Sequence, residues 1–121
     1  MRRVFAISVV MAIAAMIRPA HAETICVKKG PCPLNISAFE CTDVPKTRLI
    51  SRVCYDPLNW FLVVKLWETW TPYCSVAPGV VRVLLTADSP YQFYKKEIST
   101  PRGARGPYDC REYPMPDYSG R

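Results

Sequence analysis

Three short, predominantly apolar runs lie in the middle of the chain, at residues 49–55, 60–67 and 70–74, and polar residues separate them. The runs are rich in β-branched and aromatic residues, which favour strands. Residues 56–59 (Asp-Pro-Leu-Asn) separate the first run from the second, and residues 68–69 lie where a second tight turn belongs. Connections this short make neighbouring strands antiparallel. The pattern therefore predicts a three-stranded antiparallel meander.

A helical period of apolar residues begins after residue 77. Apolar side chains recur at helical spacing over residues 78–87, and Pro78 stands at a first turn that tolerates proline. The side of this helix that we expect to be buried carries Val80, Val83, Leu84 and Ala87. Ser89 and Pro90 form a capping pattern that begins a second helix, which continues to Ile98. A meander followed by two short helices belongs to the α+β class.

The segments on either side of this core have little periodicity. Residues 23–46 contain half of the six cysteines and three prolines, which predicts an irregular arm pinned by disulfides, with a short strand near residues 36–39. Residues 100–121 are basic and rich in proline and glycine, which predicts a flexible tail that adds nothing to the core and is partly tied by Cys110. The predicted organisation is thus an N-terminal arm, an α+β domain over residues 47–99 and a tail.

The N-terminus has the pattern of a secretory signal peptide. Arginines at positions 2 and 3 precede an apolar stretch of fourteen residues at 4–17, and Ala20-His21-Ala22 supplies a small-x-small cleavage site. The apolar stretch is shorter than the roughly 20 residues of a membrane-spanning helix. We therefore expect residues 1–22 to be removed by cleavage between Ala22 and Glu23, leaving a periplasmic or secreted bacterial protein with no stable membrane span.

Cleavage changes the charge and the chemistry that the chain offers. The 121 residues carry a net charge of +6, and the three arginines of the signal peptide lower it to +3 when they are removed. His21 is the only histidine and is removed as well, although cysteine nucleophiles and hydrolytic triads depend on this residue type. Asp56 and Glu68 are expected to be turn residues. We therefore expect no enzymatic activity, and the paired lysines at 28–29 and 95–96 are expected to be solvated.

Six cysteines remain after cleavage: Cys26, Cys32, Cys41, Cys54, Cys74 and Cys110. An even number in a short exported chain predicts a disulfide framework, although six cysteines allow 15 pairings and the sequence alone does not choose among them. The intervals contain no Cys-x-x-Cys motif, so neither a zinc site nor a thioredoxin-like redox site is expected, and no other cofactor is predicted.

The positions of Cys54 and Cys74 limit which disulfides can form. Cys54 and Cys74 fall on the first and third predicted strands, which lie two spacings of about 4.8 Å apart when the second strand runs between them. That separation is beyond the reach of a direct disulfide. We therefore expect each of them to bond to the arm or to the tail.

Several short motifs occur in the order of the predicted elements. They are Ile50-Ser-Arg-Val-Cys-Tyr-Asp56, Pro72-Tyr-Cys-Ser-Val-Ala-Pro78, Val80-Val81, Leu84-Leu85, Ala87, Ser89 and Phe93-Tyr94 through Ile98. Over residues 47–99 this order resembles the KTSC domain, a short module found at the C-terminus of some lysyl-tRNA synthetases and as stand-alone bacterial proteins. The resemblance implies the same α+β fold and a suggested RNA-binding role.

The chain departs from the family at several positions. The tyrosine-x-tyrosine centre of the family falls on Pro72 and Cys74, its helix-opening glycine on Tyr91 and its following asparagine on Lys95. We expect the fold to tolerate these changes, whereas a function that depends on the tyrosine pair or the asparagine would not carry over.

The aromatic strands predict a candidate interaction surface. Alternation separates Leu62, Val64 and Leu66 from the opposite side of the second strand, and two helices on one face of a sheet leave its other face uncovered. The candidate surface consists of Phe61, Val63, Lys65, Trp67, Trp70 and Tyr73. The arm of residues 23–46, a second subunit or a partner are the alternatives for covering it, and the arm is favoured because its cysteines can bond to Cys54 or Cys74.

Together the patterns predict an exported, non-catalytic binding or interaction module whose partner is an unidentified protein or small ligand. Nucleic-acid binding, implied by the family resemblance, is one alternative, although export and a net charge of +3 argue against it. Structural stabilisation of an envelope assembly is a second alternative.

Overall fold

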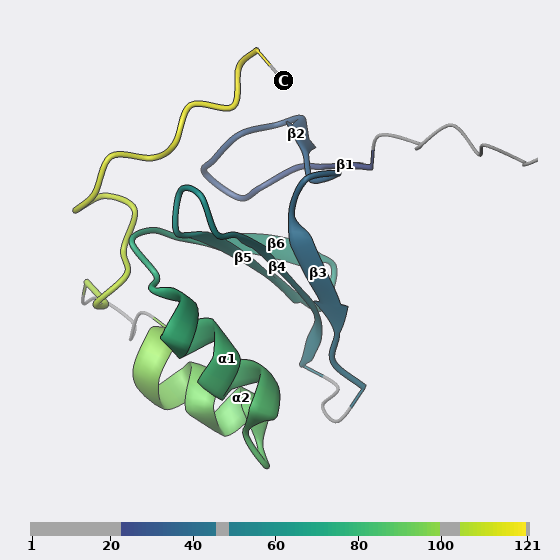
Figure 1. Ribbon diagram of the computed structural model, residues 1–121, viewed down its shortest axis with the longest axis vertical. Helices are drawn as coiled ribbons and strands as arrows, with labels where there is room; N and C mark the ends of the chain where they lie inside the picture. The colour runs from purple at the N-terminus through teal and green to yellow at the C-terminus, as the bar shows by residue number, and fades with distance from the viewer. Residues whose placement is uncertain (1–22, 46–48, 100–104, 121) are drawn as a thin grey trace, which may run out of the picture.

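The computed structural model describes residues 23–45, 49–99 and 105–120. The predicted signal peptide, residues 1–22, lies outside these ranges. The elements are β1 (Thr24–Ile25), β2 (Leu34–Asn35), β3 (Glu40–Asp43), β4 (Ile50–Asp56), β5 (Phe61–Leu66), β6 (Thr69–Tyr73), α1 (Pro78–Thr86), α2 (Pro90–Phe93) and the π-helix η1 (Tyr94–Ile98). The sheet lies between the helices on one face and the β1–β2 hairpin with the C-terminal segment on the other (Figure 1).

The predicted α+β fold and its antiparallel meander are confirmed, with a fourth strand added at one edge. The strand order is β3-β4-β5-β6, and each neighbouring pair is antiparallel. The arm contributes β3 at Glu40–Asp43, directly after the residues 36–39 where the sequence predicted a strand. The four residues of β3 are mostly polar, so no alternation marks them as a strand. Their pairing with β4 and the Cys41–Cys54 disulfide, which joins directly opposed residues, hold them in place.

Both predicted helices are present, and one of their buried faces differs from the prediction. Helix α1 buries Val81 and Leu84, whereas Val83, predicted to be buried, has 48% of its surface exposed. Five of the six residues at 80–85 are apolar, so the sequence pattern leaves the rotation of the helix open. Ser89 caps α2 as predicted, because its Oγ accepts a hydrogen bond from the N–H of Gln92 at 3.4 Å.

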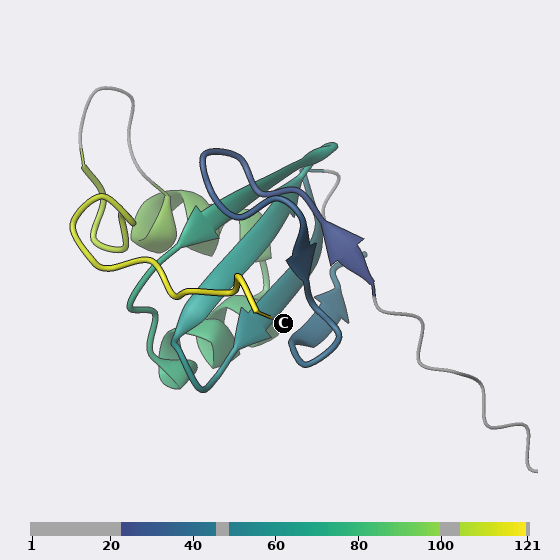
Figure 2. The same cartoon turned by 90° about the horizontal axis from the view of Figure 1, so that it is seen from above.

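Side chains pack on both faces of the sheet. The helix-facing core contains Val44, Ile50, Val53, Tyr55, Leu62, Val64, Tyr73, Val76, Val81, Leu84, Tyr94 and Ile98. The opposite core contains Val27, Leu34, Ile36, Cys54, Phe61, Val63, Trp70, Cys74 and Tyr118. In Figure 2 the arm and the C-terminal segment both run across this second face. The face that the helices leave uncovered is therefore covered by the arm, as favoured from the sequence, together with the C-terminal segment, and the prediction of an interaction surface there is wrong.

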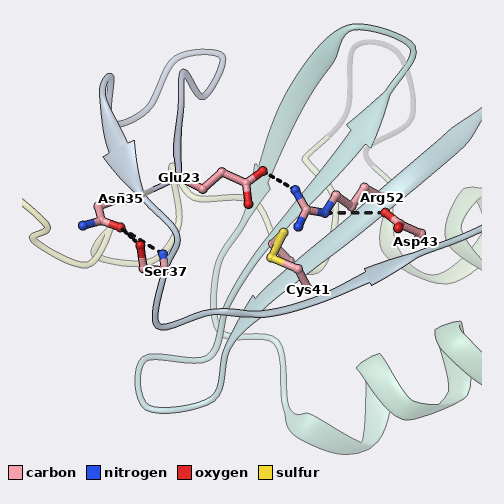
Figure 3. The surroundings of a disulfide bond; sticks show 7 residues. Glu23, Asn35, Ser37, Cys41, Asp43 and Arg52 are labelled. Atoms are coloured by element: carbon pink, nitrogen blue, oxygen red, sulfur yellow. Dashed lines mark hydrogen bonds and ion pairs between the residues drawn. A yellow bond between two sulfur atoms is a disulfide. The ribbon is translucent and has the colours of Figure 1, made fainter. Parts of the chain in front are cut away.

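Ion pairs as well as a disulfide hold the arm to the sheet. The guanidinium of Arg52 on β4 pairs with the carboxylate of Glu23 at the start of the arm and lies 3.6 Å from a carboxylate oxygen of Asp43 on β3. Figure 3 shows Arg52 between these two carboxylates, next to the disulfide of Cys41. The two ends of the arm thus converge on one strand of the sheet.

The C-terminal segment contributes to the core, contrary to the prediction that it adds nothing. The ring of Tyr118 packs against Phe39 and Phe61, with centroids 5.6 and 5.5 Å apart. Its hydroxyl donates a hydrogen bond of 2.6 Å to Oδ2 of Asp56 at the end of β4. A single aromatic residue in a segment rich in proline and glycine gives no periodic signal, and therefore the pattern did not reveal this contact.

Three disulfides join Cys26 to Cys32, Cys41 to Cys54 and Cys74 to Cys110. The expectation that Cys54 bonds to the arm or the tail and that Cys74 does likewise is confirmed, as is the tie through Cys110. A framework that pairs all six cysteines indicates an oxidising compartment outside the cytosol. Within residues 23–45, 49–99 and 105–120, no helix is long and apolar enough to span a membrane.

We expect a Tyr118→Phe variant to lower the free energy of unfolding by about 1.5–3 kcal/mol, the usual contribution of a hydrogen bond to a charged group. The variant keeps the packed ring and removes only the hydroxyl that binds the buried Asp56. Urea unfolding measures the difference. The exposed Tyr113 offers a matched control, since Tyr113→Phe should change stability by no more than about 0.5 kcal/mol. Equal stability of the two variants would show that the hydroxyl does not anchor the segment.

Candidate functional site

The six residues of the predicted surface do not form one exposed patch. Phe61, Val63 and Trp70 belong to the core under the arm, and Tyr73 belongs to the core under the helices. Lys65 is partly buried, with its Nζ 5.9 Å from the centroid of the Trp70 ring. Only Trp67, at the turn between β5 and β6, is widely exposed. Since Trp70 and Tyr73 lie on opposite faces of the sheet, the aromatic platform considered for nucleic-acid stacking does not form.

The outer edge of strand β6 is where the arm and the tail meet the sheet. The N–H of Lys28 donates to the carbonyl of Trp70 at 2.9 Å, and the N–H of Cys74 donates to the carbonyl of Tyr108 at 2.8 Å. The backbone groups of residues 70 and 74 therefore point away from the sheet at its edge. Strand alternation gives the backbone of Pro72, which lies between them, the same outward direction. Proline is tolerated there because an edge position needs no N–H for the sheet.

A cleft of about 380 Å³ opens between these two covered ends of the β6 edge. We call it the β6 cleft. The arm supplies one wall, the segment around Cys110 supplies the other, and the middle of β6 with the start of η1 lies between them. Its lining consists of Lys28, Lys29, Thr71, Pro72, Tyr73, Tyr94, Ser99, Asp109, Cys110, Arg111 and Met115.

A disulfide fixes each wall of the β6 cleft. Cys26–Cys32 closes the turn that carries Lys28 and Lys29, and Cys74–Cys110 holds the other wall to the end of β6. The turn is tightly folded, since a Cβ at Gly30 would lie 2.9 Å from Cγ1 of Val27. The backbone of Lys29 adopts the left-handed region, with φ at 53°. Both walls are therefore held in position before any ligand arrives.

The charges in the β6 cleft are predominantly positive. Arg111 donates from Nη2 to Asp109 at 2.6 Å and from Nε at 3.0 Å, and these bonds lower the pKa of Asp109 to about 2. Among the described residues, neither Lys28 nor Lys29 is in a salt bridge. The lining therefore holds three cations against one carboxylate, and that carboxylate is already bound to Arg111.

Two tyrosines add neutral hydroxyl groups to the lining. The hydroxyls of Tyr73 and Tyr94 are hydrogen-bonded to each other, and their rings meet edge to face with centroids 5.8 Å apart. Burial raises the pKa of both, and for Tyr73 the hydrogen bond to Tyr94 raises it further. The pair has two hydroxyl protons and uses one for its mutual bond, so one remains to be donated.

The β6 cleft offers hydrogen-bond donors and positive charge, which suit binding. Within the described part of the chain, no group of three or more histidine, cysteine or acidic side chains is placed to hold a metal ion. All six cysteines are oxidised, so none supplies a thiolate. The turn roles predicted for Asp56 and Glu68 are confirmed, since Asp56 accepts hydrogen bonds from Leu58 and Asn59 and Glu68 lies in the β5–β6 turn.

No protein-family model matches the chain, and neither a curated protein nor a solved structure matches it. The resemblance of residues 47–99 to the KTSC domain therefore stays a prediction.

Sequence analysis missed the β6 cleft because both of its walls come from segments without periodicity. Two signals were nevertheless present in the sequence. Pro72 within a strand marks an edge strand. Lys28 and Lys29 lie between Cys26 and Cys32, which are close enough in sequence to close a small loop.

The raised pKa of Tyr73 should make the stability of the protein depend on pH in alkaline solution. The folded protein keeps the phenolic proton above about pH 10, where the unfolded chain loses it, so the free energy of unfolding should fall as the pH rises past that value. In Tyr73→Phe, which cannot titrate, we expect the fall to be shallower by up to about 1.4 kcal/mol per pH unit.

Urea unfolding at about pH 9 and about pH 11 measures this slope. Tyr113→Phe removes an exposed hydroxyl and controls for the loss of a tyrosine as such. The same slope in Tyr73→Phe and in the parent protein would contradict the expectation.

Proposed function

We propose that the protein is an exported, non-catalytic binding module that holds its ligand in the β6 cleft. The observation that carries this proposal is the construction of the cleft, in which two separate segments, each fixed by its own disulfide, stand on either side of an edge strand. A site held rigid before binding loses less conformational entropy when the ligand enters. The volume of about 380 Å³ lies within the range of small-molecule sites.

The proposal includes a signal peptide at residues 1–22 and a periplasmic or secreted location in a bacterium. The N-terminal pattern of basic, apolar and small residues supports export. Disulfides that pair all six cysteines support an oxidising destination. We further propose that residues 47–99 form a domain of the KTSC type, with the strand order β4, β5, β6 followed by α1 and α2 in support.

Export can be measured on the full-length chain expressed in a Gram-negative host. We expect periplasmic protein that begins at Glu23 and lacks six hydrogens relative to the reduced chain, two for each disulfide. Intact mass before and after reduction gives both results. Ala22→Arg places a long charged side chain at the cleavage position and should retain residues 1–22. Recovery of the parent protein uncleaved and reduced in the cytoplasm would overturn this part of the proposal.

Binding at the β6 cleft can be measured by amide shifts in the NMR spectrum of the mature protein, titrated with a small-molecule fragment set of mixed charge. We expect the perturbed amides to cluster at Lys28, Lys29, Thr71 and Arg111. A Cys74→Ala/Cys110→Ala variant releases one wall of the cleft and should weaken fragment binding.

The matched control is Cys41→Ala/Cys54→Ala, which also removes one disulfide but leaves both walls tied. Well-dispersed spectra would establish that each variant folds before binding is compared. If either variant fails to fold, the parent protein still decides the matter, because shifts that cluster elsewhere, or none at all, would refute the cleft as the binding site.

A further inference from the structure

We propose that the ligand of the β6 cleft is a small molecule that carries an oxyanion, either a carboxylate or a phosphate, bound between the lysines of the arm and Arg111 of the tail. This inference rests on the proposed function and adds the chemical class of the ligand. Lys28 and Lys29 lie on one wall, and Arg111 lies on the other. An anion between the walls is therefore approached by cations from both sides.

The one carboxylate in the lining does not neutralise the positive charge of these cations. Asp109 accepts hydrogen bonds from the Nε, the Nη2 and the backbone N–H of Arg111, so it is engaged on its own wall. Three positive charges against one negative charge leave the lining at +2. The chain that remains after removal of residues 1–22 carries a net charge of +3 spread over 99 residues. The four charged side chains of the lining thus concentrate a charge of +2 within one small site.

Donors for an oxyanion are present on both walls and between them. A guanidinium has five N–H groups in a flat fork. Arg111 directs Nε and Nη2 toward Asp109, and no described residue accepts from its Nη1. The tyrosine pair retains one hydroxyl proton, and the raised pKa of both phenols keeps them neutral, so they do not repel an anion.

The same features disfavour other ligand classes. A cation would meet Lys28 and Lys29 with no unengaged carboxylate to compensate. A purely apolar molecule would leave these charged groups without polar partners as it displaced their water. Pro72 and Met115 provide apolar surface in the lining, so the body of the ligand can be hydrocarbon while its charged end meets the cations.

The other exposed lysine pair of the chain provides a contrast. Lys95 and Lys96 lie on exposed positions of η1 and do not line the β6 cleft. The two pairs have the same charge, but only Lys28 and Lys29 face an opposing wall that carries Arg111. Charge lining a concave site acts on a ligand more strongly than charge on a convex surface, which water and salt screen.

The test uses four probes, three of them built on a five-carbon chain of different charge: glutarate, its neutral diamide glutaramide and the cation 1,5-diaminopentane. Pyrophosphate is added to separate phosphate from carboxylate. Amide shifts of the mature, oxidised protein are titrated with each probe at low and at high salt. We expect glutarate or pyrophosphate to shift the amides of the cleft, with affinity that falls as salt rises. Whichever of the two binds more tightly identifies the preferred oxyanion.

The variants are Lys28→Ala/Lys29→Ala and, as the matched control, Lys95→Ala/Lys96→Ala. Removing the pair in the cleft should weaken anion binding about tenfold, whereas the control should bind as the parent does. All four side chains are exposed, so neither variant removes a buried contact. Equal weakening in both variants would mean that general surface charge attracts the anion and would overturn the inference.

Failure of this inference differs from failure of the proposed function. If glutaramide or diaminopentane binds the cleft as tightly as the anions, the oxyanion class is wrong and the binding module stands. The same conclusion follows if fragments from the mixed set bind the cleft but neither anion does. If neither the fragments nor any of the four probes shift the cleft amides, both proposals are wrong.

Discussion

The fold depends on the burial of strand β5 from both sides. Phe61 and Val63 point to one face of the sheet, Leu62 and Val64 point to the other, and all four have no exposed surface. Helices α1 and α2 cover one face, and among the described residues only the two-residue strands of the β1–β2 hairpin supply regular structure on the other. An irregular arm and a proline-rich tail cover that face. Segments of this kind lose much conformational entropy when they are ordered, and the three disulfides reduce that cost in the unfolded state.

The β6 cleft follows from the same constraint. The arm and the tail approach the second face from different ends of β6, and each satisfies one outward backbone group of that strand, at Trp70 and at Cys74. Pro72 lies between them without an N–H to satisfy. The edge is thereby closed to pairing with another strand, and the space that remains between the two segments is concave. The cleft thus results from the way in which the arm and the tail cover the edge of the sheet.

Local patterns revealed the parts of the fold that depend on neighbouring residues. The meander, the Ser89 cap and the Asp56 turn each follow from spacing over a few positions. Contacts that depend on distant partners were not visible, since Glu40–Asp43 becomes a strand through pairing with β4 and Tyr118 finds Asp56 across 62 residues. The arm was correctly favoured as a cover for the second face, but the interaction surface predicted there was wrong, because the covering residues, among them Val27 and Leu34, lie singly in segments without periodicity. The β6 cleft was missed for the same reason.

The bond between Tyr118 and Asp56 also sets an order of events during synthesis. Every strand of the sheet precedes residue 74, and the cover over Phe61 is complete only when residue 118 has been made. The nascent chain therefore lacks part of this cover until its C-terminal residues have been made. The C-terminal residues, made last, thus complete the cover of a sheet whose strands are made first.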